Sequence, residues 1–135
     1  MTLKRTDFFR VAGAGDTIDG REITAQDIRD MAETFDFSVY PSKVWLEHMR
    51  SIFPDGYFKN YGNLVSLKCV ENDPLGDEKV TALYAQLDVH PEVVEWANDN
   101  QKLHTSIAFT RNYRSTGKAY CSGIAITASP ASFGT

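Results

Sequence analysis

The sequence predicts one α+β domain, mainly β, built on an antiparallel barrel-like sheet with two or three peripheral helices. Several segments alternate between apolar and polar residues with the period of a strand, whereas two segments have the apolar spacing of a helix. The length of 135 residues suits a single domain, residues 1–135, with a real core. The hydrophobic content of 42% and charged content of 24% are those of an ordinary soluble protein.

Six segments are predicted as strands from their alternation and from the turn residues that bound them. In the predicted strand Tyr61–Val70, we expect Val65, Leu67 and Cys69 to share one face. In the predicted strand Lys79–Asp88, we expect every second residue from Thr81 onward to be buried. The predicted strands are Phe8–Ala12, Val44–Leu46, Tyr61–Val70, Lys79–Asp88, Leu103–Thr110 and Ala119–Thr127.

Two segments are predicted as helices. Thr24 followed by Asp27 is an acidic variant of the capping box and predicts a helix start. The helix has one apolar stripe (Ile28, Met31, Ala32, Phe35) and one polar face (Gln26, Asp27, Arg29, Asp30, Glu33). His90 and Pro91 suit the N-cap and first position of a second, shorter helix that ends near Asn98.

Composition and missing motifs argue against several function classes. The net charge of −4, without a basic stripe, argues against a nucleic-acid partner. No apolar run approaches the length of a membrane span or a signal peptide, so we expect a soluble protein that stays in the cytoplasm. Cys69 and Cys121 are far apart and without neighbouring histidines, which predicts buried reduced thiols and no metal site. No zinc-protease, phosphate-loop or dinucleotide motif is present, so no cofactor is expected.

His48 is the histidine that local structure explains least. It follows the apolar run 44–46, and a strand end can hold an imidazole rigidly at a sheet edge. His90 has its capping role, while His104 lies two residues before Ser106 and is an alternative base on the same strand face. Glu47 adjoins His48, but adjacent residues of a strand are expected to point to opposite faces, so Glu47 is poorly placed to orient the imidazole. From the residues alone, His48 is equally well explained as a structural histidine.

The remaining candidates are one hydroxyl and two carboxylates. Ser106 lies on a predicted strand, and no nucleophile-elbow motif surrounds any serine. Asp16 and Asp19 share the turn Gly15–Gly20. Taken alone, Ser106 is a serine on a strand, and either aspartate could orient a histidine.

Several blocks of the sequence resemble the capsid-scaffolding serine proteases of temperate tailed bacteriophages (the GPO family of prohead proteases). The resemblance runs in order over nearly the whole chain. Its blocks are Phe9-Arg-Val11, Gly15-Asp-Thr-Ile-Asp-Gly-Arg21, Ile23-Thr-Ala-Gln-Asp-Ile28, Met31-Ala-Glu-Thr-Phe-Asp36, Leu46-Glu-His48, Phe53-Pro-Asp-Gly56, Lys59-Asn-Tyr-Gly62, Thr105-Ser106 and Pro130-Ala-Ser-Phe-Gly-Thr135.

The resemblance implies a protease domain of herpesvirus-assemblin-like character with a catalytic triad of Asp19, His48 and Ser106. Asp16 is the fallback for the aspartate. The implied substrates are the major capsid protein precursor and the protein itself, inside the procapsid in the host cytoplasm. Other procapsid proteins and a second copy of the chain are further candidate partners. The chain stops where the scaffold segment of the family would begin, so the expectation concerns the protease domain alone.

Two other function classes stay open. The domain could bind capsid protein without cutting it, as an assembly module, or it could be a cysteine or metal hydrolase. A protease also needs backbone N–H donors for the oxyanion, and the turn at Gly117 and the region of Gly123 are the candidates.

Overall fold

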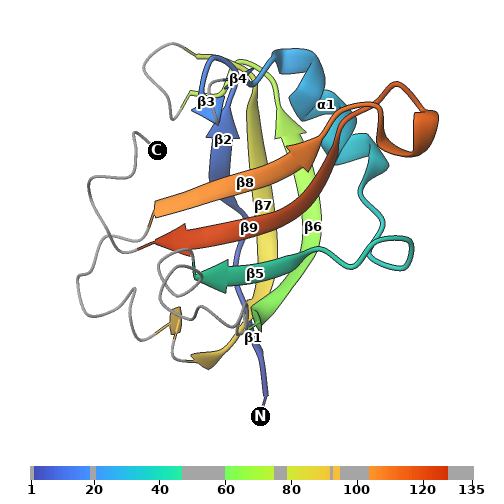
Figure 1. The fold of residues 1–135 in the computed structure, drawn as a ribbon. Coiled ribbons are helices and arrows are strands. Elements are labelled where there is room, and N and C mark those ends of the chain that lie inside the picture. Colours follow the sequence, from blue (N-terminus) through green and yellow to red (C-terminus); the bar gives the residue numbers. More distant parts are fainter. Residues whose placement is uncertain are drawn as a thin grey trace.

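The computed structural model of the chain is a mainly β fold around one curled sheet, as the sequence predicts (Figure 1). The structure describes residues 2–18, 21–46, 60–74, 79–91, 93–94 and 104–127. Within these ranges the sheet has seven strands in the order β1-β7-β6-β5-β9-β8, and β2 also pairs with β7. The strands are β1 (Lys4–Arg5), β2 (Phe9–Gly13), β5 (Lys43–Leu46), β6 (Asn60–Val70), β7 (Ala82–Val89), β8 (His104–Thr110) and β9 (Tyr120–Thr127). A separate hairpin pairs β3 (Thr17–Ile18) with β4 (Arg21–Glu22), and the helical elements are α1 (Ala25–Thr34) and the 3-10 turn η1 (Tyr113–Ser115).

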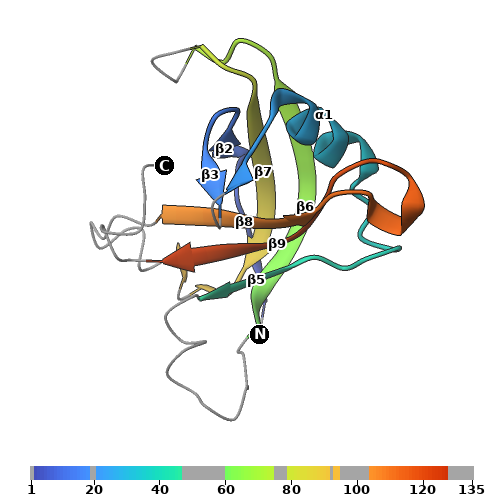
Figure 2. The same cartoon turned by 45° about the horizontal axis from the view of Figure 1, so that its top comes forward.

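The sheet curls into two layers that cross each other. Strands β8, β9 and β5 form one layer and run across β2, β7 and β6, which form the other (Figures 1 and 2). Strand β6 belongs to both layers, because Gly62 is opposite Val44 of β5 and also opposite Val89 of β7. A Cβ atom at position 62 would overlap the carbonyl oxygen of Asp88, so this corner requires a residue without a side chain.

The core lies between the layers and follows the predicted alternation on β7. Leu83, Ala85 and Leu87 are buried there, as the sequence predicts. The prediction for β6 is wrong in part, because Leu64 is fully buried and Val65 is not. The pairing of β6 with β7 shifts between Leu64 and Ser66, and this bulge changes which residues face the core.

Helix α1 covers one end of the sheet and begins as predicted. The Asp27 N–H donates to Thr24 Oγ1 (3.0 Å), and the Thr24 N–H donates to Asp27 Oδ2 (2.9 Å), which completes the capping box. Two residues of the predicted apolar stripe, Ile28 and Met31, are fully buried. The expected polar face is wrong at Asp27 and Asp30, which are only 6% and 8% exposed. Both carboxylates are buried because groups from the β8–β9 connection bind them.

The second predicted helix is described only at its start, where residues 91, 93 and 94 are helical. His90 precedes it, and the His90 carbonyl accepts a hydrogen bond from the Val93 N–H (3.0 Å). Both cysteines are free thiols as expected, but Cys69 is only half-buried, whereas Cys121 is fully buried. No helix among the described residues is long and apolar enough to cross a bilayer.

Candidate active site

Ser106 lies on β8 with its side chain on the face opposite the core. Its neighbour Ile107 is buried between the layers, and Thr105 lines a cavity on that same inner side. Successive strand residues alternate between faces, so Ser106 points to the outer face, and it is half-buried there. Its partner on β9 is Ala125, and the next outward pair is Ala108 with Gly123. The residues of β9 opposite this stretch of β8 are therefore small, while Trp45 of β5 is opposite Ala125 on its other side.

Strand β5 brings the chain that leads to His48 onto the same layer. It runs parallel to β9, with Leu46 opposite Ile126, and Ile126 is in turn opposite Thr105 of β8. The end of β5 and the beginning of β8 therefore lie in one row across three strands. His48 follows two residues after Leu46 and, like Glu47, lies outside the described residues, so its side-chain geometry stays a prediction.

The β3–β4 hairpin carries the chain that leads to Asp19. Ile18 is opposite Arg21, and Asp19 and Gly20, which connect them, also lie outside the described residues. The guanidinium of Arg21 stacks on the ring of Phe109, at 5.0 Å from its centroid. Phe109 is three residues along β8 from Ser106, a distance of about 10 Å in a strand. The hairpin that bears Asp19 therefore lies against the strand that bears Ser106.

The alternative carboxylate, Asp16, is engaged in the turn that precedes the hairpin. Its Oδ2 accepts a hydrogen bond from the Gly13 N–H (2.8 Å), and its carbonyl oxygen accepts one from the Ile23 N–H (2.7 Å). These contacts give Asp16 a structural role in closing the turn.

Arg111 connects this hairpin to both β8 and α1. Its Nε donates to Asp27 Oδ1 (3.0 Å), and its Nη2 donates to Asp27 Oδ2 (2.7 Å) and to the carbonyl oxygen of Glu22 in β4 (2.8 Å). The two-pronged hydrogen bond from Arg111 holds the pKa of Asp27 below its usual value, against the opposing effect of burial. Sequence reasoning missed this contact because the two residues are 84 positions apart, although an aspartate at N3 of a capped helix was visible.

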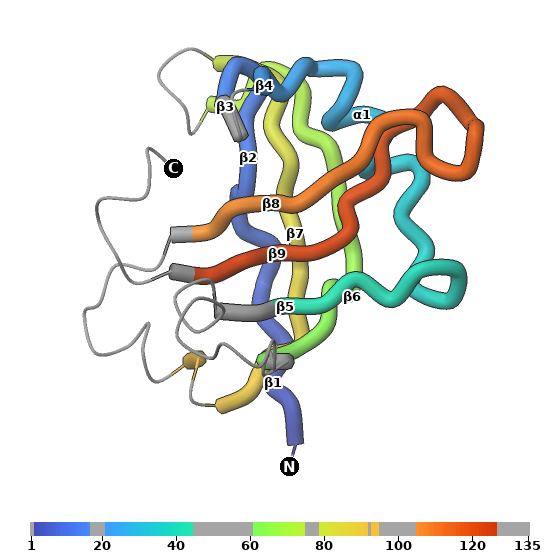
Figure 3. Tube along the Cα trace, in the orientation of Figure 1, coloured from blue at the N-terminus to red at the C-terminus, as the bar shows by residue number. Residues whose placement is uncertain are grey.

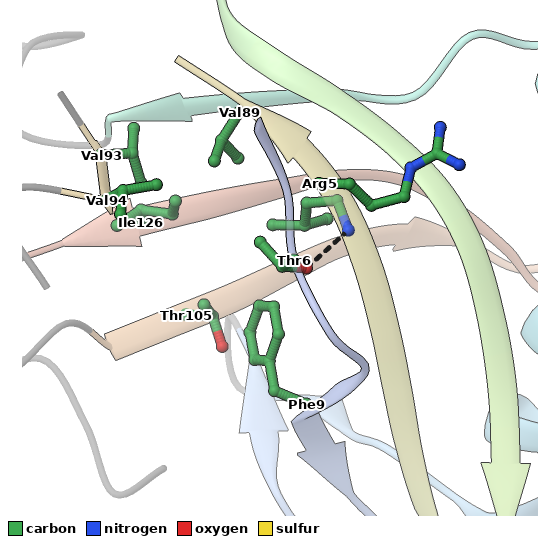
Figure 4. A pocket seen from close by; sticks show the side chains of 9 residues that line it. Arg5, Thr6, Phe9, Val89, Val93, Val94, Thr105 and Ile126 are labelled. Atoms are coloured by element: carbon green, nitrogen blue, oxygen red, sulfur yellow. Dashed lines mark hydrogen bonds between the residues drawn. The ribbon is translucent and has the colours of Figure 1, made fainter. Parts of the chain in front are cut away.

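A cavity of about 400 Å³ opens on the inner side of β8, behind Thr105 (Figure 4). It lies between the layers, where Phe9 of β2 faces Thr105 of β8. Its walls are mainly aliphatic, and sequence reasoning did not find it. The lining residues are Arg5, Thr6, Phe9, Leu87, Val89, Val93, Val94, Thr105 and Ile126.

The other candidates fall in different places. The backbone of His104 is on β8 opposite Thr127, while its side chain is outside the described part of the chain. Gly123 lies on β9 opposite Ala108, close to Ser106, whereas Gly117 lies beyond η1 at the far end of the β8–β9 connection.

No group of three or more His, Cys, Asp or Glu side chains suited to a metal ion occurs among the described residues. Burial raises the pKa of the Cys121 thiol to about 12, which disfavours a thiolate there.

The family model described as GPO serine peptidase, N-terminal domain, matches residues 6–135, and the chain therefore belongs to that family of proteins. Family membership confirms the resemblance seen in the sequence. The "Capsid assembly scaffolding protein" of Escherichia phage P2 is 43% identical to this chain over 136 positions. That match covers 100% of this chain and 48% of the relative, so the chain spans about half the relative's length. No solved structure gives a significant match.

Proposed function

We propose that this chain is the serine endopeptidase domain of a phage capsid-assembly protein, with Ser106 as nucleophile, His48 as base and Asp19 as the carboxylate that orients it. The observation that carries the proposal is the position of Ser106. Its hydroxyl is on the outer face of β8. Strand β5, which leads to His48, joins the same layer through β9, and Arg21, which follows the Asp19–Gly20 turn, contacts Phe109 on the core side of β8. The serine peptidase family to which the chain belongs supports this assignment.

In the proposed reaction, His48 takes the proton of Ser106 as its oxygen attacks the carbonyl carbon of a peptide bond. The imidazolium then returns that proton to the leaving amine, and water hydrolyses the acyl-enzyme. Asp19 fixes the imidazole tautomer and stabilises its charged form, a contribution of up to about 10⁴-fold in turnover. Of the two candidate regions for the oxyanion donors, Gly123 is the nearer to Ser106, because it lies opposite Ala108, whereas Gly117 is at the far end of the β8–β9 connection.

The proposed substrates are a capsid protein precursor and the protein's own scaffold segment, cut inside the assembling shell in the host cell. The relative's name, capsid assembly scaffolding protein, supports a role at this stage. Confinement of enzyme and substrate in one shell raises the effective concentration, so a slow intrinsic rate suffices. A second copy of the chain is a further candidate partner in that shell.

Coexpression of the full-length protein with the capsid precursor tests the proposal. Ser106→Ala is expected to leave the precursor uncut while the domain stays folded. Ser122→Ala is the matched control, because Ser122 is a half-buried serine on the neighbouring strand that donates to the Ala108 carbonyl (3.1 Å). Undiminished cleavage by the Ser106→Ala protein would refute the nucleophile.

The relative's name also favours a second candidate, a module that binds capsid protein without cutting it. In that case His48→Ala and Ser106→Ala would both leave capsid processing intact, and Ser106 would resist a fluorophosphonate probe. Capsid binding that survives both substitutions while processing stops would instead be consistent with the protease.

A further inference from the structure

The contact made by Arg111 is both two-pronged and well shielded from solvent. The Asp27 side chain is 9% exposed, whereas the carboxylates of two other two-pronged pairs, Arg5–Asp88 and Arg29–Glu71, are 24% and 50% exposed. The Asp73 side chain is more deeply buried, at 2%, but its contact with Arg10 is 3.8 Å long. A shielded, two-pronged arginine–carboxylate contact fixes geometry better than an exposed pair, which contributes little. The third hydrogen bond of Arg111 goes to the backbone of β4, so the side chain holds a strand as well as a helix.

The contact joins the two pieces of chain that carry proposed catalytic residues. Arg111 follows β8 directly and is five residues beyond Ser106, while its acceptor, Glu22, is three residues beyond Asp19. Phe109 adds to the junction, because the guanidinium groups of Arg21 and Arg111 lie 5.0 and 5.5 Å from its ring centroid.

The surrounding structure makes this junction rigid on the helix side. The connection between β8 and β9 lies along α1 (Figure 3), and Thr34 Oγ1 donates to the carbonyl of Ala119 (2.8 Å). Asp27 itself is fixed by the capping box with Thr24. On the hairpin side, the Gly15 N–H donates to the Ile23 carbonyl (2.8 Å), and Arg111 links the β4 backbone to this framework, beside the contact of Arg21 with Phe109.

We propose that Arg111 is a positioning residue of the active site, which holds the β3–β4 hairpin, and with it Asp19, in register with Ser106 on β8. The inference rests on the proposed function. Arg111 itself does not touch substrate. Without the contact the hairpin keeps its own backbone pairs but loses its hydrogen bond to Arg111, the residue that follows β8. Small displacements of a catalytic group lower rates strongly.

The test is a double-mutant cycle on the full-length protein, read out as the rate of fluorophosphonate labelling of Ser106. Arg111→Met is expected to slow labelling about 10- to 100-fold in the native background. In the Asp19→Ala background the same change is expected to alter the rate less than about 2-fold, because a residue that acts through Asp19 has nothing left to position. Arg111→Lys keeps the charge but not the two-pronged geometry, so its labelling rate should lie between those of the native protein and Arg111→Met. As a control, Arg29→Met removes another two-pronged pair made by a residue of α1, the Arg29–Glu71 pair, and should leave the labelling rate unchanged.

Equal slowing by Arg111→Met in both backgrounds, or no slowing in either, would overturn the inference. Amide hydrogen exchange at Ile23 and Gly15 gives a second readout that needs no catalysis. Faster exchange there in Arg111→Met than in Arg29→Met supports the junction, and equal exchange refutes it. A native protein that is not labelled at Ser106 refutes the proposed function, and the exchange result then decides the role of Arg111 in the hairpin alone.

Discussion

Substitution of Gly62 tests the corner at which β6 passes from one layer to the other. In Gly62→Ala the new Cβ would overlap the carbonyl oxygen of Asp88 and lie 2.9 Å from the Cα of Val89. These neighbours are backbone atoms of the paired strand β7, so relief requires β6 and β7 to separate. Overpacking typically costs about 1–3 kcal/mol, and a backbone neighbour places this site at the upper end, about 3 kcal/mol. For a domain of this size that corresponds to a fall in Tm of about 10 °C.

Gly117→Ala is the matched control for this experiment. Gly117 has a φ of +77°, and no atom lies within 4 Å of a Cβ built there. In Gly117→Ala, the only expected cost is the strain of an alanine in the left-handed conformation. This strain lowers the free energy of unfolding by about 1–2 kcal/mol and Tm by about 4 °C. Thermal unfolding followed by circular dichroism measures both variants. A Gly62→Ala protein that melts no lower than Gly117→Ala would refute the tight approach of the two strands at the corner.

Three further predictions concern Asp27, the cysteines and the cap of α1. Because the folded-state pKa of Asp27 is lowered, its stabilising effect is present above the unfolded pKa of about 3.9 and is lost as pH falls through the folded value. Asp27→Asn should therefore cost about 1–2 kcal/mol at pH 7, with the difference from the native protein shrinking in urea titrations below pH 4; a constant difference would contradict the ion pair. Because burial raises the pKa of Cys121 to about 12, its thiol should resist iodoacetamide at pH 8 in the native state but not in urea. Cleavage activity should survive this treatment. Rapid alkylation of the native protein, or loss of activity, would instead favour a cysteine hydrolase. Thr24→Ala should lower the unfolding free energy by about 1 kcal/mol through loss of its bond to the Asp27 N–H, whereas an unchanged denaturation midpoint would argue against the capping box.

Local patterns were sufficient to predict the six longer strands and the start of α1, but not the two-residue strands β1, β3 and β4, which are too short to show an alternation. The alternation on β7 needs only one buried face, and the capping box needs only residues three apart. The prediction for β6 was wrong where a bulge shifts the register after Leu64, since a bulge depends on the strand opposite and leaves no mark in the sequence.

The polar face of α1 shows why parts of the site could not be predicted. Asp27 and Asp30 have the spacing of solvent-facing residues, yet Arg111 and the Ala119 N–H cover them from more than 80 positions away. Ser106 was selected through family resemblance, because one serine on a strand carries no signal of its own. The structure adds that the side chain of Ser106 faces away from the core. Strand alternation predicts this orientation only after Ile107, its neighbour, is known to be buried.

The most direct test of the account is to locate the adduct that a fluorophosphonate forms with the native protein. Peptide mapping by mass spectrometry is expected to find a single modification on Ser106, lost in His48→Ala and retained in Ser122→Ala. A protein that takes up no probe under conditions in which it cuts capsid precursor, or an adduct on any other residue, would contradict the proposed nucleophile.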